Sequence, residues 1–187
     1  MHTVLEHPLV GHRVALMRDR ETPPKLFREL VNETTTFLAY EALRDIRTRR
    51  VEIETPVAKA TGERVDEPRI VLVPILRAGM GMLDAMLRVL PYAKVPPAKD
   101  GAELAIVIDP MLATGGSACD AVAQLKKLGY RRIKFLNLIS APEGIAKFEE
   151  CHPDVPVFTA AKDERLNSHF YIVPGLGDAG DRIFGTL

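Results

Sequence analysis

Residues 106–117 read Ile-Val-Ile-Asp-Pro-Met-Leu-Ala-Thr-Gly-Gly-Ser and carry the clearest structural pattern in the chain. The run 106–108 is short, apolar and β-branched, which is typical of a strand buried on both faces of a parallel sheet. Asp109 follows, where the carboxyl end of such a strand can present an acid to solvent. The small residues 114–117 come next and leave their backbone N–H groups open to an anion.

A helix is expected directly after these glycines. Ser117 can cap it, its apolar positions Ala118, Val122 and Leu125 are spaced as on one helical face, and Gly129 can end it. The N-terminus of a helix offers free N–H groups and the positive end of the helix dipole. Strand, acid, glycine loop and helix together predict a phosphate-binding site.

The loop differs from the common nucleotide motifs. It carries no Gly-Lys-Ser/Thr and no Gly-x-Gly-x-x-Gly, so neither a P-loop nor a dinucleotide fingerprint is present. An acid in front of a Thr-Gly-Gly-Ser cradle suits a sugar phosphate, with the phosphate on the loop and the sugar hydroxyls near Asp109. The alternative interpretation is an ordinary tight strand-to-helix turn.

Two further loops carry candidate chemistry. Residues 73–81 repeat the order of strand, glycine loop and helix, with Arg77 in the turn as a cation suited to a diphosphate. The alternative for Arg77 alone is a surface pair with a carboxylate. Residues 171–181 are rich in glycine, and such an irregular loop can offer backbone donors and acceptors to a flat heterocycle, although by composition alone it is a turn-rich tail.

The pattern along the chain predicts an α/β fold with a doubly wound parallel sheet and a single domain over residues 1–187. An early helix begins near residues 22–24, and residues 51–57 suggest short exposed strands broken by Pro56 and Gly62. The strands that follow are expected at 70–73, 103–108, 133–139 and 155–160, and the helices at 81–89, 117–128 and 142–151. Ligands of such sheets bind at the carboxyl ends of the strands.

Composition excludes several classes of protein. The 25 basic residues balance 25 acidic ones, and the densest basic cluster (Arg47, Arg49 and Arg50) fits a solvated helix end, so no nucleic-acid partner is expected. The two cysteines are too few for a disulfide scaffold. No long apolar span or signal segment is evident, so we expect no membrane partner and a cytoplasmic protein.

The three loops resemble those of the type I phosphoribosyltransferases, and the match to the uracil phosphoribosyltransferase branch extends over nearly the whole chain. Pro110 stands where most members carry a second acid, as in the uracil-specific branch. The family resemblance implies a parallel sheet with a small hood built from the N- and C-terminal segments. It also implies conversion of uracil and 5-phosphoribosyl 1-diphosphate (PRPP) to UMP and diphosphate in pyrimidine salvage.

The same resemblance implies roles for individual residues. PRPP is expected at Arg77, Asp109, Pro110, Met111, Leu112, Ala113, Thr114, Gly115, Gly116, Ser117 and Asp178. Uracil is expected at Ile172, Gly177, Asp178 and Ala179, with Arg77 and Asp109 as the catalytic pair. The resemblance further implies a non-proline cis peptide at Leu76–Arg77, Mg²⁺ held through the substrate diphosphate without a direct protein ligand, a homo-oligomer (dimer or larger) and GTP as an effector.

One departure from the family lies between Val95 and Pro96, where members carry a strand and a hairpin arm whose Arg helps to hold PRPP. Either the protein lacks this arm, or further residues belong between these two positions. We favour the second interpretation, because loss of the strand would leave a sheet edge uncovered.

Two other functions stay open at this point. One is a phosphoribosyltransferase for another base, of which a purine would need a wider pocket. A non-catalytic PRPP-sensing regulator on the same scaffold would be expected to show a basic face for nucleic acid, which the balanced charge does not favour.

Overall fold

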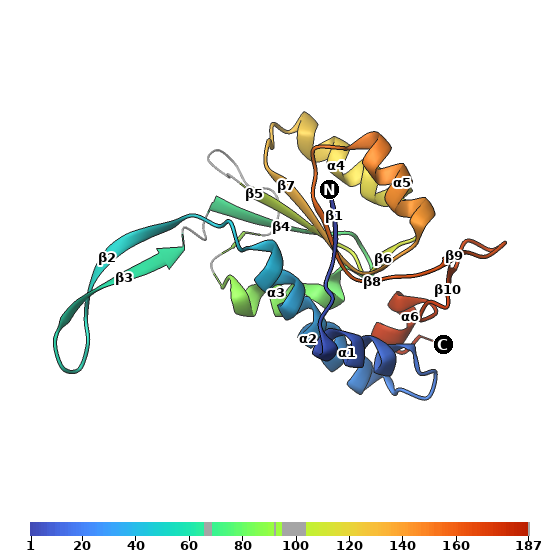
Figure 1. Ribbon diagram of the computed structural model, residues 1–187, viewed down its shortest axis with the longest axis horizontal. Helices are drawn as coiled ribbons and strands as arrows, with labels where there is room; N and C mark the ends of the chain where they lie inside the picture. The colour runs from blue at the N-terminus through green and yellow to red at the C-terminus, as the bar shows by residue number, and fades with distance from the viewer. Residues whose placement is uncertain (66–68, 92, 95–103, 187) are drawn as a thin grey trace.

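A six-stranded sheet forms the centre of the molecule (Figure 1). The computed structural model describes residues 1–65, 69–91, 93–94 and 104–186. The parallel strands follow the order β1 (His2–Val4), β8 (Val157–Lys162), β7 (Ile133–Ser140), β5 (Leu104–Ile108) and β4 (Ile70–Pro74). The short β6 (Met111–Leu112) pairs with the end of β7. Each predicted strand of the core is present; residue 103 of the expected strand 103–108 lies outside the described residues.

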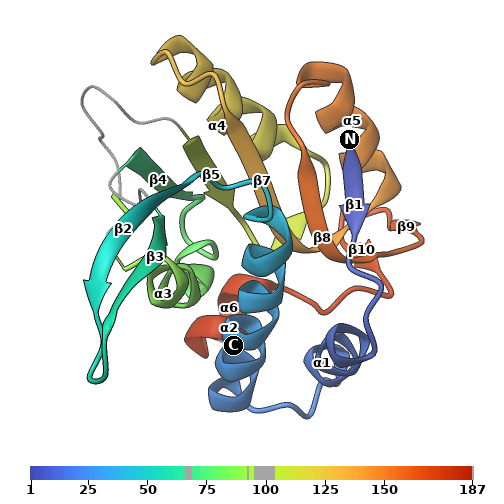
Figure 2. The ribbon, with the colours of Figure 1, turned by 60° about the vertical axis from the view of Figure 1, so that its left-hand side comes forward.

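Helices cover both faces of this sheet (Figure 2). On one face lie α4 (Gly116–Lys127) and α5 (Pro142–Cys151), and on the other lie α2 (Pro24–Ala42) and α3 (Met80–Val89). Successive side chains of β5 point to opposite faces of the sheet. Ala105 and Val107 pack toward α4 and α5, whereas Ile106 and Ile108 pack toward α2 and α3. Burial on both faces explains the continuous apolar run in the sequence.

The sheet reverses its winding direction between β4 and β5. After α3, the chain returns along the outer edge of β4, where Lys94 forms a parallel bridge with Val71. The following strand, β5, pairs with the opposite edge of β4 and continues through α4 to β7. In open α/β sheets, ligands bind at such a switch point, outside the carboxyl ends of the two strands.

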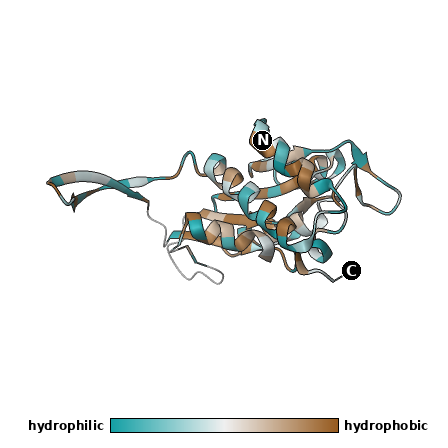
Figure 3. Cartoon of the chain, turned by 90° about the horizontal axis from the view of Figure 1, so that it is seen from below, coloured by the Kyte–Doolittle hydropathy of each residue, from teal (hydrophilic) through white to brown (hydrophobic). Residues whose placement is uncertain are grey.

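A hairpin extends away from this body (Figures 1 and 3). Its strands are β2 (Thr48–Glu54) and β3 (Lys59–Val65), which pair antiparallel. The prediction that Gly62 breaks a strand is wrong, because Gly62 lies inside β3 and pairs with Val51. Arg49 and Arg50 belong to β2, so the basic cluster is not a helix end.

Helices of the N- and C-terminal segments pack together beside the sheet and form the expected hood. The participating elements are α1 (Pro8–Arg18), α2, the small antiparallel pair β9 (Arg165–Leu166) and β10 (Ile172–Val173), and α6 (Ala179–Phe184). The Arg28 guanidinium donates to the Ile183 carbonyl oxygen at 2.8 Å, and the Arg182 guanidinium lies 4.3 Å from the Phe27 ring centroid. No helix within the described residues has the length and apolar character needed to span a membrane.

Candidate active site

A cavity of about 220 Å³ lies at the switch point, beyond the ends of β4 and β5. All three loops singled out in the sequence contribute to its wall. The lining residues are Ala78, Asp109, Met111, Ala113, Phe170, Tyr171, Ile172, Gly177, Asp178, Ala179 and Gly180. Residues about 100 positions apart in the chain therefore line the same cavity, at the carboxyl ends of the strands where this fold class is expected to bind ligands.

Asp109 lies where β5 ends, with its backbone N–H donating to the Leu136 carbonyl oxygen at 3.1 Å. The sequence suggested an acid facing solvent, but the side chain is half-buried in the cavity wall. Burial raises the pKa of this carboxyl to about 7, only partly offset by a backbone hydrogen bond from Met111. Asp109 is thus poised to change its protonation state near neutral pH.

The chain after Asp109 follows β7 before it enters α4. Leu138 and Ile139 both donate their N–H groups to the Pro110 carbonyl oxygen at 3.0 Å. Pro110 and Leu112 are buried, whereas Met111 and Ala113 reach the cavity.

The N-terminus of α4 is uncapped by any side chain. Gly115 is the N-cap residue, in the left-handed region at φ 82°, and the helix begins at Gly116. The prediction that Ser117 caps the helix is therefore wrong, because the left-handed turn at Gly115 starts the helix earlier and places Ser117 inside its first turn. Thr114, Gly116 and Ser117 are not buried in the core. The first N–H groups of α4 remain without a side-chain acceptor, which suits an anionic ligand.

The loop after β4 approaches β5 closely. Ile75 donates its N–H to the Ile108 carbonyl oxygen at 3.0 Å, and a Cβ at Gly79 would lie 2.5 Å from the same oxygen. The Leu76–Arg77 peptide bond is cis, as predicted. The exposed Arg77 guanidinium lies 3.0 Å from the Asp181 carboxylate and 5.2 Å from the Phe184 ring centroid. Arg77 reaches from this loop to α6 and does not line the cavity.

The C-terminal loop presents its backbone to the cavity. Gly175 and Gly177 have φ values of 64° and 80°, and a Cβ at Gly175 would lie 2.1 Å from the Ile172 carbonyl oxygen. Asp178 is the N-cap of α6, where its Oδ1 accepts from the Asp181 N–H at 2.9 Å. Ile172, Gly177, Asp178 and Ala179 all line the cavity, so the residues proposed for the base lie together.

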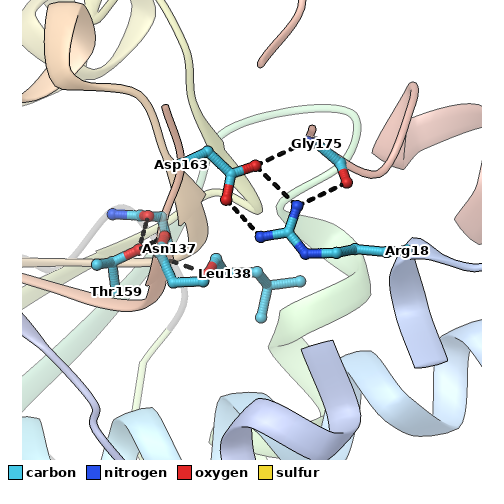
Figure 4. Close-up of polar contacts among 7 residues, drawn as sticks. Arg18, Asn137, Leu138, Thr159, Asp163 and Gly175 are labelled. Carbon is cyan, nitrogen blue, oxygen red and sulfur yellow. Dashed lines mark hydrogen bonds and ion pairs between the residues drawn. The ribbon is translucent and has the colours of Figure 1, made fainter. Parts of the chain in front are cut away.

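A buried ion pair, which the sequence did not reveal, holds this loop (Figure 4). Asp163 accepts from the Arg18 guanidinium and, at 2.7 Å, from the Gly175 N–H, while Arg18 also donates to the Gly175 carbonyl oxygen at 2.9 Å. The Asp163 side chain is only 2% exposed. Both backbone polar groups of Gly175 are therefore bound by one ion pair between α1 and the end of β8.

A larger hollow of about 670 Å³ lies elsewhere, between the β1–α1 segment and α2. Leu9, Phe37 and Tyr40 are among its lining residues. It contains no residue of the three loops, so its size does not make it the candidate site.

Comparison with known proteins shows which family this chain resembles. The family model described as uracil phosphoribosyltransferase matches residues 4–99 and 89–186. The uracil phosphoribosyltransferase of Exiguobacterium sibiricum is 49% identical over 203 residues, covering 98% of this chain and 97% of the relative. The AQ2163 protein from Aquifex aeolicus has a solved structure with a TM-score of 0.90 and 36% identity, covering 98% of both chains.

The same comparisons bear on the arm expected between Val95 and Pro96, which lies outside the described residues. The uracil phosphoribosyltransferase of Dictyoglomus turgidum is 47% identical over 207 residues, with both chains covered completely, whereas this chain has 187 residues. The two matched segments of the family model overlap at residues 89–99. These full-length matches show that the chain belongs to the uracil phosphoribosyltransferase family.

Proposed function

We propose that this protein transfers the phosphoribosyl group of PRPP to N1 of uracil, forming UMP and diphosphate. The observation that carries the proposal is the convergence of the three loops on one cavity at the switch point. A substrate with phosphates at both ends of a ribose needs two anion-binding loops on either side of an acid, with a site for the base facing the sugar.

The uncapped N-terminus of α4 suits the 5′-phosphate, since its free N–H groups and dipole favour an anion. The Asp109 and Asp178 carboxylates line the adjoining cavity, where they can accept hydrogen bonds from the ribose hydroxyls. Arg77 lies in the neighbouring loop and would exchange its contact with Asp181 for the diphosphate.

In this proposal, backbone groups of the C-terminal loop recognise the base by hydrogen bonding. Uracil alternates carbonyl acceptors and an N–H donor along one edge, which rigid backbone groups of Ile172, Gly177 and Ala179 can match. Cytosine carries an amino group in place of one carbonyl, and each buried polar mismatch costs about 1–3 kcal/mol.

Departure of the diphosphate builds positive charge on the anomeric carbon, as in glycosyl transfer generally. The ionised Asp109 carboxylate stabilises that charge, and Arg77 stabilises the departing diphosphate. The two loops hold the sugar so that N1 of uracil faces the anomeric carbon, which reduces the entropic part of the barrier.

Mg²⁺ fits this arrangement as an ion held mainly by the substrate. Within the described residues no group of three or more His, Cys, Asp or Glu side chains could hold a metal alone. Mg²⁺ is commonly bound by one or two carboxylates together with substrate phosphates and water. Asp109 and Asp178 are the carboxylates in the cavity wall that could take part. When bound, the ion would neutralise charge on the diphosphate.

The other candidate functions have less support. A PRPP-sensing regulator would not need a loop shaped for a base, and the overall charge of zero does not favour nucleic-acid binding. A cytoplasmic location, assembly into a dimer or larger homo-oligomer and GTP as an effector stay predictions from the family resemblance.

The test is formation of UMP from uracil and PRPP, with and without Mg²⁺. Cytosine, adenine and orotate serve as competing bases in parallel reactions. Faster turnover of another base would reassign the substrate, and binding of PRPP without any turnover would favour the regulator.

A further inference from the structure

Phe170 has an unusual backbone conformation. It lies in the turn between β9 and β10, and it is the non-glycine residue with a positive φ (63°) among the described residues. A bulky side chain at such an angle strains the backbone, so glycine, asparagine or aspartate is the usual choice there. Folding of the turn alone therefore gives no reason for phenylalanine at this position.

The side chain is unusual as well. Phe170 is 68% exposed, so its ring contributes little to the hydrophobic core. It nevertheless lines the cavity at the switch point, on the same wall as Tyr171 and Ile172. A residue with a large, mostly exposed apolar ring thus lines the cavity together with Tyr171.

Asn167 holds the turn in this conformation. Its side-chain oxygen accepts from the backbone N–H groups of His169 and Tyr171, at 2.9 and 3.0 Å. Its carbonyl oxygen accepts from the Phe170 N–H at 3.0 Å, and its N–H donates to the Tyr171 carbonyl oxygen at 2.8 Å. These contacts hold Phe170 in place before any ligand arrives. Strain maintained by surrounding contacts often occurs at functional positions.

We propose that Phe170 stacks on one face of the uracil ring and is a base-binding residue of the site. This inference rests on the proposed function. Backbone groups of Ile172, Gly177 and Ala179 can match the edge of the base, but hydrogen bonds in the plane of a ring do not cover its faces. An aromatic side chain supplies that cover and shields the in-plane bonds from water.

Replacement by glycine separates this role from a structural one. Phe170→Gly removes the ring and relieves the positive-φ strain, so the fold should be as stable as before or more stable. Stacking of a base on an aromatic ring is worth enough that its loss should raise the KM for uracil roughly five- to a hundredfold. The KM for PRPP should stay within about twofold, since the phosphate loops are untouched.

Two further variants complete the experiment. Phe170→Leu keeps apolar bulk without a ring, so its uracil KM should lie between those of the wild type and the glycine variant. Tyr40→Ala removes another exposed aromatic side chain (74% exposed) that lines the distant hollow, and it should leave both KM values unchanged. Thermal unfolding is measured for every variant.

The outcomes distinguish the two proposals. A higher uracil KM in Phe170→Gly, with an unchanged PRPP KM and an undiminished Tm, supports the stacking role. A glycine variant with the wild-type uracil KM overturns it, while UMP formation by the wild type leaves the proposed function standing. Absence of UMP formation by the wild type overturns both.

Discussion

Arg77 and Asp181 form an ion pair, with 3.0 Å between the guanidinium and the carboxylate, that links the loop after β4 to α6. The pair joins the loop proposed for the diphosphate to the helix that follows the base loop. Asp181 also accepts from the Thr186 hydroxyl at 2.5 Å, and these two contacts, with Thr186 contributing more, lower the pKa of its carboxyl. Arg77, the side chain proposed to bind the diphosphate, is therefore already paired with the carboxylate of Asp181.

The first prediction follows from this competition. Arg77→Gln should raise the Kd for PRPP at least tenfold, because it removes the cation proposed for the diphosphate. Asp181→Asn should leave that Kd unchanged or lower it, because it releases Arg77. Calorimetric titration with PRPP measures both variants. Equal weakening by the two substitutions would show that the ion pair, and not a free Arg77, is required.

The second prediction concerns Asp109. Asp109→Asn should reduce kcat/KM by at least a hundredfold, since the neutral amide cannot offset the charge that develops on the ribose. The same substitution should not lower the Tm at pH 8, because it removes a carboxylate that is costly to bury. Parallel losses of activity and Tm would instead mark Asp109 as a structural acid.

Burial of Asp109 also gives stability a defined pH dependence. Its pKa of about 7 lies above the ordinary value of 3.8, so between these limits the folded protein binds a proton that the unfolded chain has lost. The contribution of this group to stability is present below about pH 4 and is lost as the pH rises toward 7, by about 1.4 kcal/mol for each pH unit between the two pKa values. Thermal unfolding at pH 5 and pH 8 should show this loss in the wild type and a smaller one in Asp109→Asn.

The sequence predicted the core of the fold because its signals are local. Residues 106–128 carry an apolar run, an acid, glycines and a helical face in succession, and β5, the phosphate loop and α4 follow that order. The helix cap was assigned wrongly for a physical reason: Ser117 is the better capping residue by type, but the left-handed conformation of Gly115 decides where the helix starts.

Long-range contacts gave no such signal. Arg18 and Asp163 are 145 positions apart, and nothing in either neighbourhood marks them as partners. Phe170 stands next to the predicted base loop, but its positive φ depends on the Asn167 contacts. Features that arise only when distant segments pack together had to come from the structure.

The third prediction tests the Arg18–Asp163 ion pair. Asp163→Asn weakens the hold on Gly175 and leaves Arg18 without its counter-charge, so the uracil KM should rise severalfold while the PRPP KM stays constant. Asp163→Glu should restore part of the loss. Stability should fall by about 2–4 kcal/mol, because one partner of a largely buried pair is removed.

A matched control for this prediction is Asp45→Asn. Asp45 pairs with the buried Lys134, away from the cavity. That variant should lose stability without any change in the uracil KM. A similar rise in the uracil KM for both variants would mean that general destabilisation, and not the position of Gly175, is responsible.

The fourth prediction compares two adjacent glycines at the start of α4. A Cβ at Gly115 would lie 3.0 Å from the Gly144 carbonyl oxygen, and its φ of 82° disfavours any side chain, so Gly115→Ala should cost about 1–2 kcal/mol and weaken PRPP binding. A Cβ at Gly116 would meet only the Thr114 hydroxyl, at 3.9 Å, so Gly116→Ala should fold normally. Denaturant titration and PRPP calorimetry check both. Equal stability of the two variants would contradict the strain assigned to Gly115.

The last prediction tests backbone recognition of the base. One glycine inserted between Leu176 and Gly177 should displace Gly177, Asp178 and Ala179 from the cavity wall together. The Leu176 carbonyl oxygen, which accepts from the Arg182 guanidinium at 3.0 Å, holds the chain on one side of the insertion. The displacement therefore falls on the residues that face the base, and the kcat/KM for uracil should drop by at least a hundredfold. Ala179→Gly keeps the same backbone groups in place, so it should still prefer uracil to cytosine, with a loss of about 0.4–1 kcal/mol from added chain freedom. PRPP should bind both variants through Thr114 and the N-terminus of α4. An insertion variant with the wild-type kcat/KM for uracil would mean that the base is read elsewhere, and backbone recognition at this loop would have to be abandoned.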